Sequence, residues 1–224
     1  MHPTPVIQST PPRRAYAASV ALLVWAALAV QLWLTVSIVL AQGRGFVMGL
    51  VVFFGFFTVL TNLLAALVMT GHAVGSRFTA YRRAASPVVM TTTAAAITVV
   101  GAVYFLILRH LWKPEGAQFW ADVALHYVVP VLVVVFWAWT VPARALGWKD
   151  ATWFFVYPLV YLVYVFARGE IVHLYPYAFI DVLVIGYRAA LLNAAGIMLA
   201  YALVVGLFCG LKILFSRTPS RNPT

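Results

Sequence analysis

The chain has very few charged side chains. Only 9% of its 224 residues are Asp, Glu, Lys or Arg, whereas 64% are hydrophobic. Soluble domains carry about 25% charged and 45–50% apolar residues, so this chain has too few ionisable groups to cover a soluble surface. The composition therefore excludes an ordinary soluble domain and indicates an integral membrane protein.

Cysteine and acidic residues are also scarce. The single cysteine, Cys209, lies inside an apolar run, so no disulfide can form within the chain. Fifteen basic residues stand against five acidic ones, which gives a formal charge of +10. In a membrane chain such an excess reflects basic loops on the cytoplasmic side more often than nucleic-acid binding. We therefore expect membrane lipids as partners and no nucleic acid.

Long apolar runs fill most of the chain. A helix needs about 20 apolar residues to cross the hydrocarbon core of a bilayer. Six runs are candidates, at residues 15–40, 47–70, 87–108, 123–141, 152–167 and 182–214. The sequence thus predicts an all-α fold, with a six-helix transmembrane domain at 15–214. Disordered cytoplasmic tails rich in Pro, Ser and Thr are expected at 1–14 and 215–224.

Basic residues between these runs predict the orientation. With the N-terminus inside, ten Lys and Arg residues lie on the cytoplasmic side and four lie outside. This bias favours a multi-pass protein of the cell membrane with both termini in the cytoplasm. The inner set is Arg13, Arg14, Arg77, Arg82, Arg83, Arg144, Lys149, Lys212, Arg217 and Arg221, and the outer set is Arg44, Arg109, Lys113 and Arg168.

Ionisable residues in or near the later helices gather at the predicted outer end. Such residues are costly in lipid and usually face the interior of a bundle. A chemical site in this chain is therefore expected to open outward. The residues concerned are Glu115, Asp122, His126, Arg168, Glu170, His173, Asp181 and Arg188.

Asp122 and His126 are four residues apart and therefore lie on one helix face. A carboxylate in this position can hold one ring nitrogen of the histidine and leave the other free as a base. Pro130 removes the hydrogen bond to the carbonyl of His126, so a kink is expected there. The alternative is a structural histidine that bonds a neighbouring helix.

The second run carries a stripe of Gly55, Thr58, Thr61 and Asn62. Threonines in membrane helices commonly bond their own backbone and small residues permit close packing, so helix packing is one interpretation. A nucleophilic hydroxyl is the other. If this run is one helix that starts at residue 47, Thr58 lies about 16 Å below the outer boundary, and His126 only about 6 Å below it. A buried Asn62 amide needs a partner.

In the fifth run, Tyr157, Tyr161, Tyr164 and Arg168 recur at helical spacing. One helix face therefore carries hydroxyl groups and ends in a cation. This face is either an interhelical hydrogen-bonding surface or the wall of a ligand pocket.

In the sixth run, Asp181 and Arg188 are seven residues apart on one face. A buried Arg188 requires an acceptor, for which Asp122 and Asp181 are the candidates. Arg188 then forms either a structural ion pair or a site for a lipid carboxylate or phosphate.

Three short motifs resemble those of a known family. They are FTVLTN at 57–62, LHYVVP at 125–130 and YPY at 175–177. Together with six spans, they resemble the androgen-induced protein family over residues 15–214. The resemblance implies a membrane hydrolase of fatty acid esters of hydroxy fatty acids, in which Thr58 matches the family's threonine nucleophile and His126 its histidine.

This resemblance gives the first hypothesis, a lipid-ester hydrolase in which Asp122 orients His126 and His126 activates Thr58, with no cofactor or metal. Thr61 competes with Thr58 for the role of nucleophile. The second hypothesis is a non-catalytic binder or transporter of an amphipathic anion, and the third is a haem protein that uses His126 with His110 or His173. The expected substrate contacts are Asn62, Tyr157, Tyr161, Tyr164, Arg168, Asp181 and Arg188.

Overall fold

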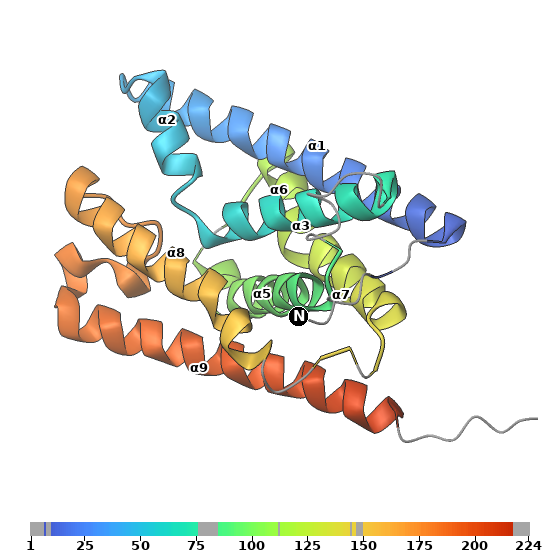
Figure 1. Cartoon of the computed structure of the whole chain (residues 1–224). Helices are drawn as coiled ribbons and strands as arrows, with labels where there is room; N and C mark the ends of the chain where they lie inside the picture. The colour runs from blue at the N-terminus through green and yellow to red at the C-terminus, as the bar shows by residue number, and fades with distance from the viewer. Residues whose placement is uncertain are drawn as a thin grey trace, which may run out of the picture.

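Six helical stretches of the chain are long and apolar enough to cross a membrane. They lie in a computed structural model that describes residues 7, 10–75, 85–111, 113–143, 145–146 and 150–216. The stretches form an all-helical bundle (Figure 1), so the predicted all-α architecture is confirmed. Their bounds are Pro11–Ala41, Phe57–Val74, Pro87–His110, Gly116–Thr140, Ala151–Val172 and Val182–Leu214.

The first transmembrane helix, α1 (Pro11–Ala41), packs along α3 (Phe57–Val74). Both helices bury small side chains, including Ala17 and Ala27 on α1 and Ala65 on α3. Small residues allow helix backbones to approach closely in a membrane. α1 begins four residues before the predicted run, and the last helix continues two residues into the predicted C-terminal tail. Residues 1–6, 8–9 and 217–224 of the predicted tails lie outside the described residues.

The second apolar run is divided, and the prediction of one continuous helix is wrong at this point. α2 (Phe46–Phe53) ends, the chain turns at residues 54–56, and α3 starts at Phe57. The turn contains Gly55, where a Cβ atom would lie 2.9 Å from the guanidinium carbon of Arg168, so a larger residue would require that side chain to shift. As a consequence, Thr58 lies in the first turn of a helix.

The fourth span also changes its helical character. α6 (Gly116–Val123) passes into a π-helical turn, η2 (Ala124–Val128), and then into α7 (Val129–Thr140). Val129 donates its N–H to the carbonyl of Ala124, five residues back. Pro130 follows and has no N–H to offer to the carbonyl of His126. The sequence predicts a kink at this proline, and the structure has a widened turn directly before it.

α5 (Pro87–Leu106) contacts α3, α7, α8 and α9. It starts as the sequence predicts, since the Ser86 hydroxyl accepts from Val89 N–H at 3.2 Å and Pro87 occupies the first turn. A short helix, η1 (Leu108–His110), follows it.

The last two spans are α8 (Ala151–Val172) and α9 (Val182–Ser216), joined by a loop that contains η4 (Ala178–Ile180). α8 ends at His173, a non-glycine residue in the left-handed conformation (φ 52°). The helical path of α9 is interrupted at Gly186, whose φ of 74° and ψ of 161° are not helical. The continuous part of this span therefore begins at Tyr187.

Candidate functional site

The polar face of α8 bonds the broken second apolar run. The hydroxyls of Tyr161 and Tyr164 donate to the carbonyls of Gly55 and Phe54 at 3.1 and 3.2 Å. These two carbonyls belong to the turn between α2 and α3, where the helical hydrogen-bond pattern is interrupted. Unsatisfied backbone groups are costly in a membrane, so the tyrosines stabilise a break that lipid alone would not permit.

Arg168 extends the same face. Its side chain is 7% exposed, and its guanidinium donates to Val51 O at 2.8 and 3.1 Å and to Leu174 O at 2.7 Å. It thereby caps the last turn of α2 and holds the loop after α8. These bonds fit the interpretation of this face as an interhelical hydrogen-bonding surface, and Arg168 does not border the cavity described below.

Tyr157 is the first residue of this face, and its hydroxyl forms a hydrogen bond with the Thr61 hydroxyl. The two hydroxyls lie 2.9 Å apart, and the Thr61 side chain is completely buried. Thr61 is thus engaged by a neighbouring helix, whereas Thr58 borders the cavity described below. Of the two candidate nucleophiles, Thr58 is the one that a ligand can reach.

Asp122 and His126 form the pair that their spacing predicts. The Nδ1 atom of His126 lies 3.0 Å from the Asp122 carbonyl oxygen and 3.3 Å from its carboxylate. A carbonyl oxygen only accepts, so Nδ1 carries the proton and the Nε2 lone pair is left available. The ring of Tyr104 stacks on the imidazole with 4.0 Å between centroids, which fixes the plane of the histidine.

Thr58 meets a tyrosine that the sequence did not single out as a site residue. The Tyr177 hydroxyl lies 3.3 Å from the Thr58 N–H and 3.4 Å from its hydroxyl. No side chain caps α3 at Phe56, so the phenol oxygen takes that role from the loop after α8. Burial raises the pKa of Tyr177, which keeps it a neutral hydrogen-bond donor. In the sequence, only the YPY motif at 175–177 indicated that Tyr177 could belong to the site.

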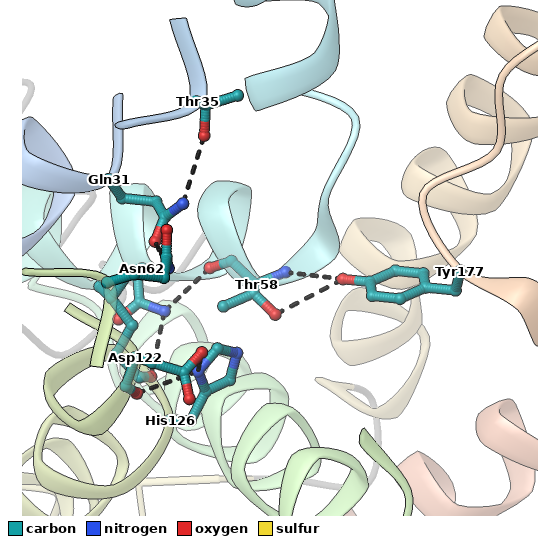
Figure 2. Close-up of polar contacts among 9 residues, drawn as sticks. Gln31, Thr35, Thr58, Asn62, Asp122, His126 and Tyr177 are labelled. Atoms are coloured by element: carbon teal, nitrogen blue, oxygen red, sulfur yellow. Dashed lines mark hydrogen bonds and ion pairs between the residues drawn. The ribbon is translucent and has the colours of Figure 1, made fainter. Parts of the chain in front are cut away.

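Asn62 connects the segments that carry Thr58 and His126. It is fully buried, and its Nδ2 atom donates to Thr58 O at 2.9 Å and to Leu125 O at 3.3 Å. Figure 2 shows the His126 ring beside the Asp122 carboxylate, and Asn62 joined by a dashed line to the backbone of Thr58. Thr58 and His126 themselves share no hydrogen bond; both are described, and the Thr58 hydroxyl bonds Tyr177.

The bonds of Asn62 also limit its chemistry. Both hydrogens of its amide are engaged by carbonyls, so donation to a substrate, as predicted for Asn62, would require this connection to break. Its Oδ1 atom is buried without a hydrogen-bond partner. Such an acceptor costs about 1–3 kcal/mol, and the two Nδ2 hydrogen bonds, at about 0.5–1.5 kcal/mol each, offset part of this cost.

The expectation that Arg188 is buried and pairs with an aspartate is wrong. Its side chain is exposed, directly after the interruption at Gly186, and does not pair with Asp122 or Asp181 within the described part of the chain. The Asp181 carboxylate instead accepts from Leu183 N–H at 3.0 Å, at the start of α9. These two residues therefore lie outside the group formed by Thr58, Asn62, Asp122 and His126.

A cavity of about 70 Å³ borders the start of α3. Its walls come from α5, α8, α9 and the loop around η4, and they are apolar apart from three hydroxyl-bearing residues, Thr58, Tyr161 and Tyr177. Tyr161 already donates to Gly55. Thr58 and Tyr177 therefore supply the polar end of an otherwise apolar space.

The other histidines named above lie apart from this site. His110 is exposed in η1, where Arg109 donates to it at 3.3 Å, and His173 is exposed at the end of α8. Among the residues that the structure describes, no three His, Cys, Asp or Glu side chains come together as a metal-binding group.

These features define a six-helix membrane bundle with an apolar cavity and hydroxyl groups at its end. A scan against protein-family models and searches of curated proteins and of solved structures find no match to the chain. The resemblance of the three motifs therefore remains a prediction, and the function is argued from the site.

Proposed function

We propose that this membrane protein hydrolyses lipid esters, with Thr58 as the nucleophile. The observation that carries the proposal is the place of Thr58, which borders an apolar cavity at the N-terminus of α3 and whose hydroxyl lies 3.4 Å from that of Tyr177. An acyl chain fits the apolar walls and brings its ester carbonyl to this hydroxyl. The resemblance to the androgen-induced protein family implies the same residue and the same reaction.

His126 is the base in this proposal. A threonine hydroxyl is a weak nucleophile, and a base within about 2.6–3.2 Å activates it. Asp122 holds Nδ1 of His126 and leaves Nε2 as the acceptor. Catalytic hydrogen bonds often tighten only when substrate is bound, and in this proposal the bond between Thr58 and His126 forms at that stage.

The reaction proceeds in two steps. Thr58 Oγ1 attacks the ester carbonyl while its proton moves to His126 Nε2, and the C–O bond to the alcohol then breaks as Nε2 protonates the leaving oxygen. Water next attacks the acyl-threonine, gives a proton to Nε2 and releases the acid, and the proton returns to Thr58. The Tyr177 hydroxyl, which lies beside Thr58 Oγ1, donates to the oxyanion in both steps.

The alternative of an amphipathic-anion transporter has less support from the geometry. Two cationic side chains are buried within the described residues, Arg168 and Lys212, and both donate to backbone carbonyls. Neither borders the cavity. An anion entering this space would find no available positive charge.

The same proposal places the protein in the cell membrane with both termini in the cytoplasm, as the excess of basic residues in the inner loops favours. The cavity end of α3 then lies toward the outside. Reporter domains fused to each terminus should be active only in the cytoplasm, and a periplasmic or extracellular signal would reverse the orientation.

The test of the reaction is labelling with a hydroxyl-reactive fluorophosphonate probe, together with hydrolysis of acyl esters by the purified protein. Thr58→Ala should abolish labelling and lower turnover by about 10³-fold or more, as expected for loss of a nucleophile. His126→Ala should lower turnover by a similar factor.

Thr98→Ala is the matched control for this test, because the Thr98 hydroxyl bonds its own helix at Ala94 O (2.7 Å) and does not border the cavity. It should behave as wild type. Turnover that persists in folded Thr58→Ala protein would contradict the threonine mechanism.

A further inference from the structure

We propose that the cavity selects a lipid whose polar group at this point is uncharged, with its chain between α5, α8 and α9 and its oxygen group at Thr58 and Tyr177. This inference rests on the proposed site and names its ligand class. It excludes lipids that carry a charged group close to the hydroxyl end, such as a free fatty acid bound through its carboxylate.

The walls of the cavity contain no charged side chain among the described residues. Burial of an ionised carboxylate without a cation and several hydrogen bonds costs several kcal/mol. The two groups that remain at the polar end, Thr58 and Tyr177, are neutral hydroxyls. They can pair with an ester, hydroxyl or ether oxygen without that penalty.

The start of α3 is the one feature near the cavity that would attract an anion, because N–H groups at a helix N-terminus are partly positive. That position is already filled from within the protein. The phenol oxygen of Tyr177 accepts the Thr58 N–H and also lies against the Phe57 N–H. A carboxylate would have to displace Tyr177, which is wedged between Phe56 and Phe179 by ring contacts at 5.7 and 5.1 Å.

The residues at the apolar side of the cavity indicate that a ligand enters it from the lipid bilayer. Leu162 on α8 and Ile197 and Met198 on α9 border the cavity and are half-buried, so they also reach the outer surface of the bundle. Neighbouring Val163 and Leu199 on that surface are exposed and apolar. A water-sized group needs about 10–15 Å³ of such space, so the cavity holds a short part of a chain and the remainder extends toward the bilayer.

Direct binding tests the charge preference without requiring turnover. Purified protein in a non-ionic detergent is titrated with oleyl alcohol and with oleate, at a pH that ionises the acid. Oleyl alcohol should bind at least about tenfold more tightly, because the oleate carboxylate must be buried without a cation. Equal or tighter binding of oleate would overturn the inference.

Two neighbouring alanines on α9 locate the binding site. Ala194 is buried and borders the cavity, whereas Ala195 is exposed on the same helix. Ala194→Phe should fill the space and weaken oleyl alcohol binding by about tenfold or more, since core space is close-packed. Ala195→Phe should bind as wild type. Ala194→Leu is the smaller substitution if the phenylalanine variant does not fold, and an unchanged affinity in it would contradict the site.

The binding and hydrolysis experiments together distinguish a failure of this ligand-class inference from a failure of the proposed hydrolase reaction. Binding of oleyl alcohol that is sensitive to Ala194 but accompanied by no ester hydrolysis would leave the neutral-lipid site in place and refute the reaction. Hydrolysis with equal preference for an ester whose carboxylate lies close to the ester group and for its methyl-capped counterpart would keep the reaction and refute the charge selection.

Discussion

Two polar regions of the bundle resemble each other in composition and differ in how completely their hydrogen bonds are formed. The face of α8 from Tyr157 to Arg168 directs its hydroxyls and guanidinium to Thr61 and to three carbonyls of the broken second run. The region around Thr58 and His126 keeps unused capacity, namely the Thr58 hydroxyl at the cavity and His126 Nε2.

The difference separates polar residues that stabilise the fold of the bundle from polar residues that are able to contact a ligand. Tyr161 and Tyr164 already donate their hydroxyl hydrogens to backbone carbonyls and so cannot donate them to a ligand. Groups that are held by one bond and open on another side can take part in chemistry. If this comparison is correct, substitutions in the α8 face should act mainly on stability, and substitutions around Thr58 mainly on turnover.

Arg168→Ala should have the largest effect on stability. It leaves the carbonyls of Val51 and Leu174 without their donor in a buried position, and hydrogen bonds to charged groups contribute about 1.5–3 kcal/mol each. We expect a loss of about 3 kcal/mol or more, measured by thermal unfolding in detergent. Arg188→Ala, at an exposed arginine, should change stability by less than about 0.5 kcal/mol. Equal effects of the two would contradict the role given to Arg168.

Asn62→Ala should rank second and should act on both properties. Two Nδ2 hydrogen bonds are lost, each contributing about 0.5–1.5 kcal/mol, while removal of the unpaired Oδ1 offsets part of the loss. We expect a decrease of about 1–2 kcal/mol in unfolding free energy. Turnover should fall by more than about tenfold, because the link between Thr58 and Leu125 is broken. A variant that loses stability but keeps full turnover would show that this link does not position the site.

Tyr161→Phe should cost about 1 kcal/mol, the contribution of one hydrogen bond, here to Gly55 O. Tyr164→Phe should cost less, because its bond to Phe54 O is at a more exposed position. Neither change should lower kcat by more than about twofold if the α8 face is structural. A large loss of kcat with unchanged unfolding temperature would move Tyr161 into the reacting site.

Thr58→Val should have the smallest effect on stability. Valine keeps the branched shape, and the hydroxyl removed makes only a long bond of 3.4 Å to Tyr177. We expect a change below about 1 kcal/mol, with loss of turnover and of probe labelling. Thermal unfolding and labelling on the same preparation measure both. An unfolded Thr58→Val protein would indicate that Thr58 is a packing residue.

The number and type of the spans could be predicted because a bilayer requires long apolar helices and the runs are separated by polar segments. The break in the second run could not. Gly55 was a weak local signal, and the groups that make the turn possible lie more than a hundred residues later, on α8. A sequence read locally cannot show that distant donors satisfy the carbonyls of a turn.

The site could be predicted only where its contacts are local in the sequence. The four-residue spacing of Asp122 and His126 is local, and their contact follows directly from helix geometry. The depth assigned to Thr58 assumed a helix that starts at residue 47, and α3 starts instead at Phe57. The contact between Tyr177 and Thr58 joins residues 119 positions apart, and the exposure of Arg188 follows from the interruption at Gly186.

The widened turn at Ala124–Val128 has a consequence for the whole fourth span. A π turn holds an extra residue, and one residue corresponds to a rotation of about 100° around a regular helix. In a regular helix Asp122 and the buried Phe136, which are fourteen residues apart, would lie about 40° from each other on one face. The extra residue changes this angle, so α6 and α7 do not present their faces to the bundle in the register that a regular helix would give them.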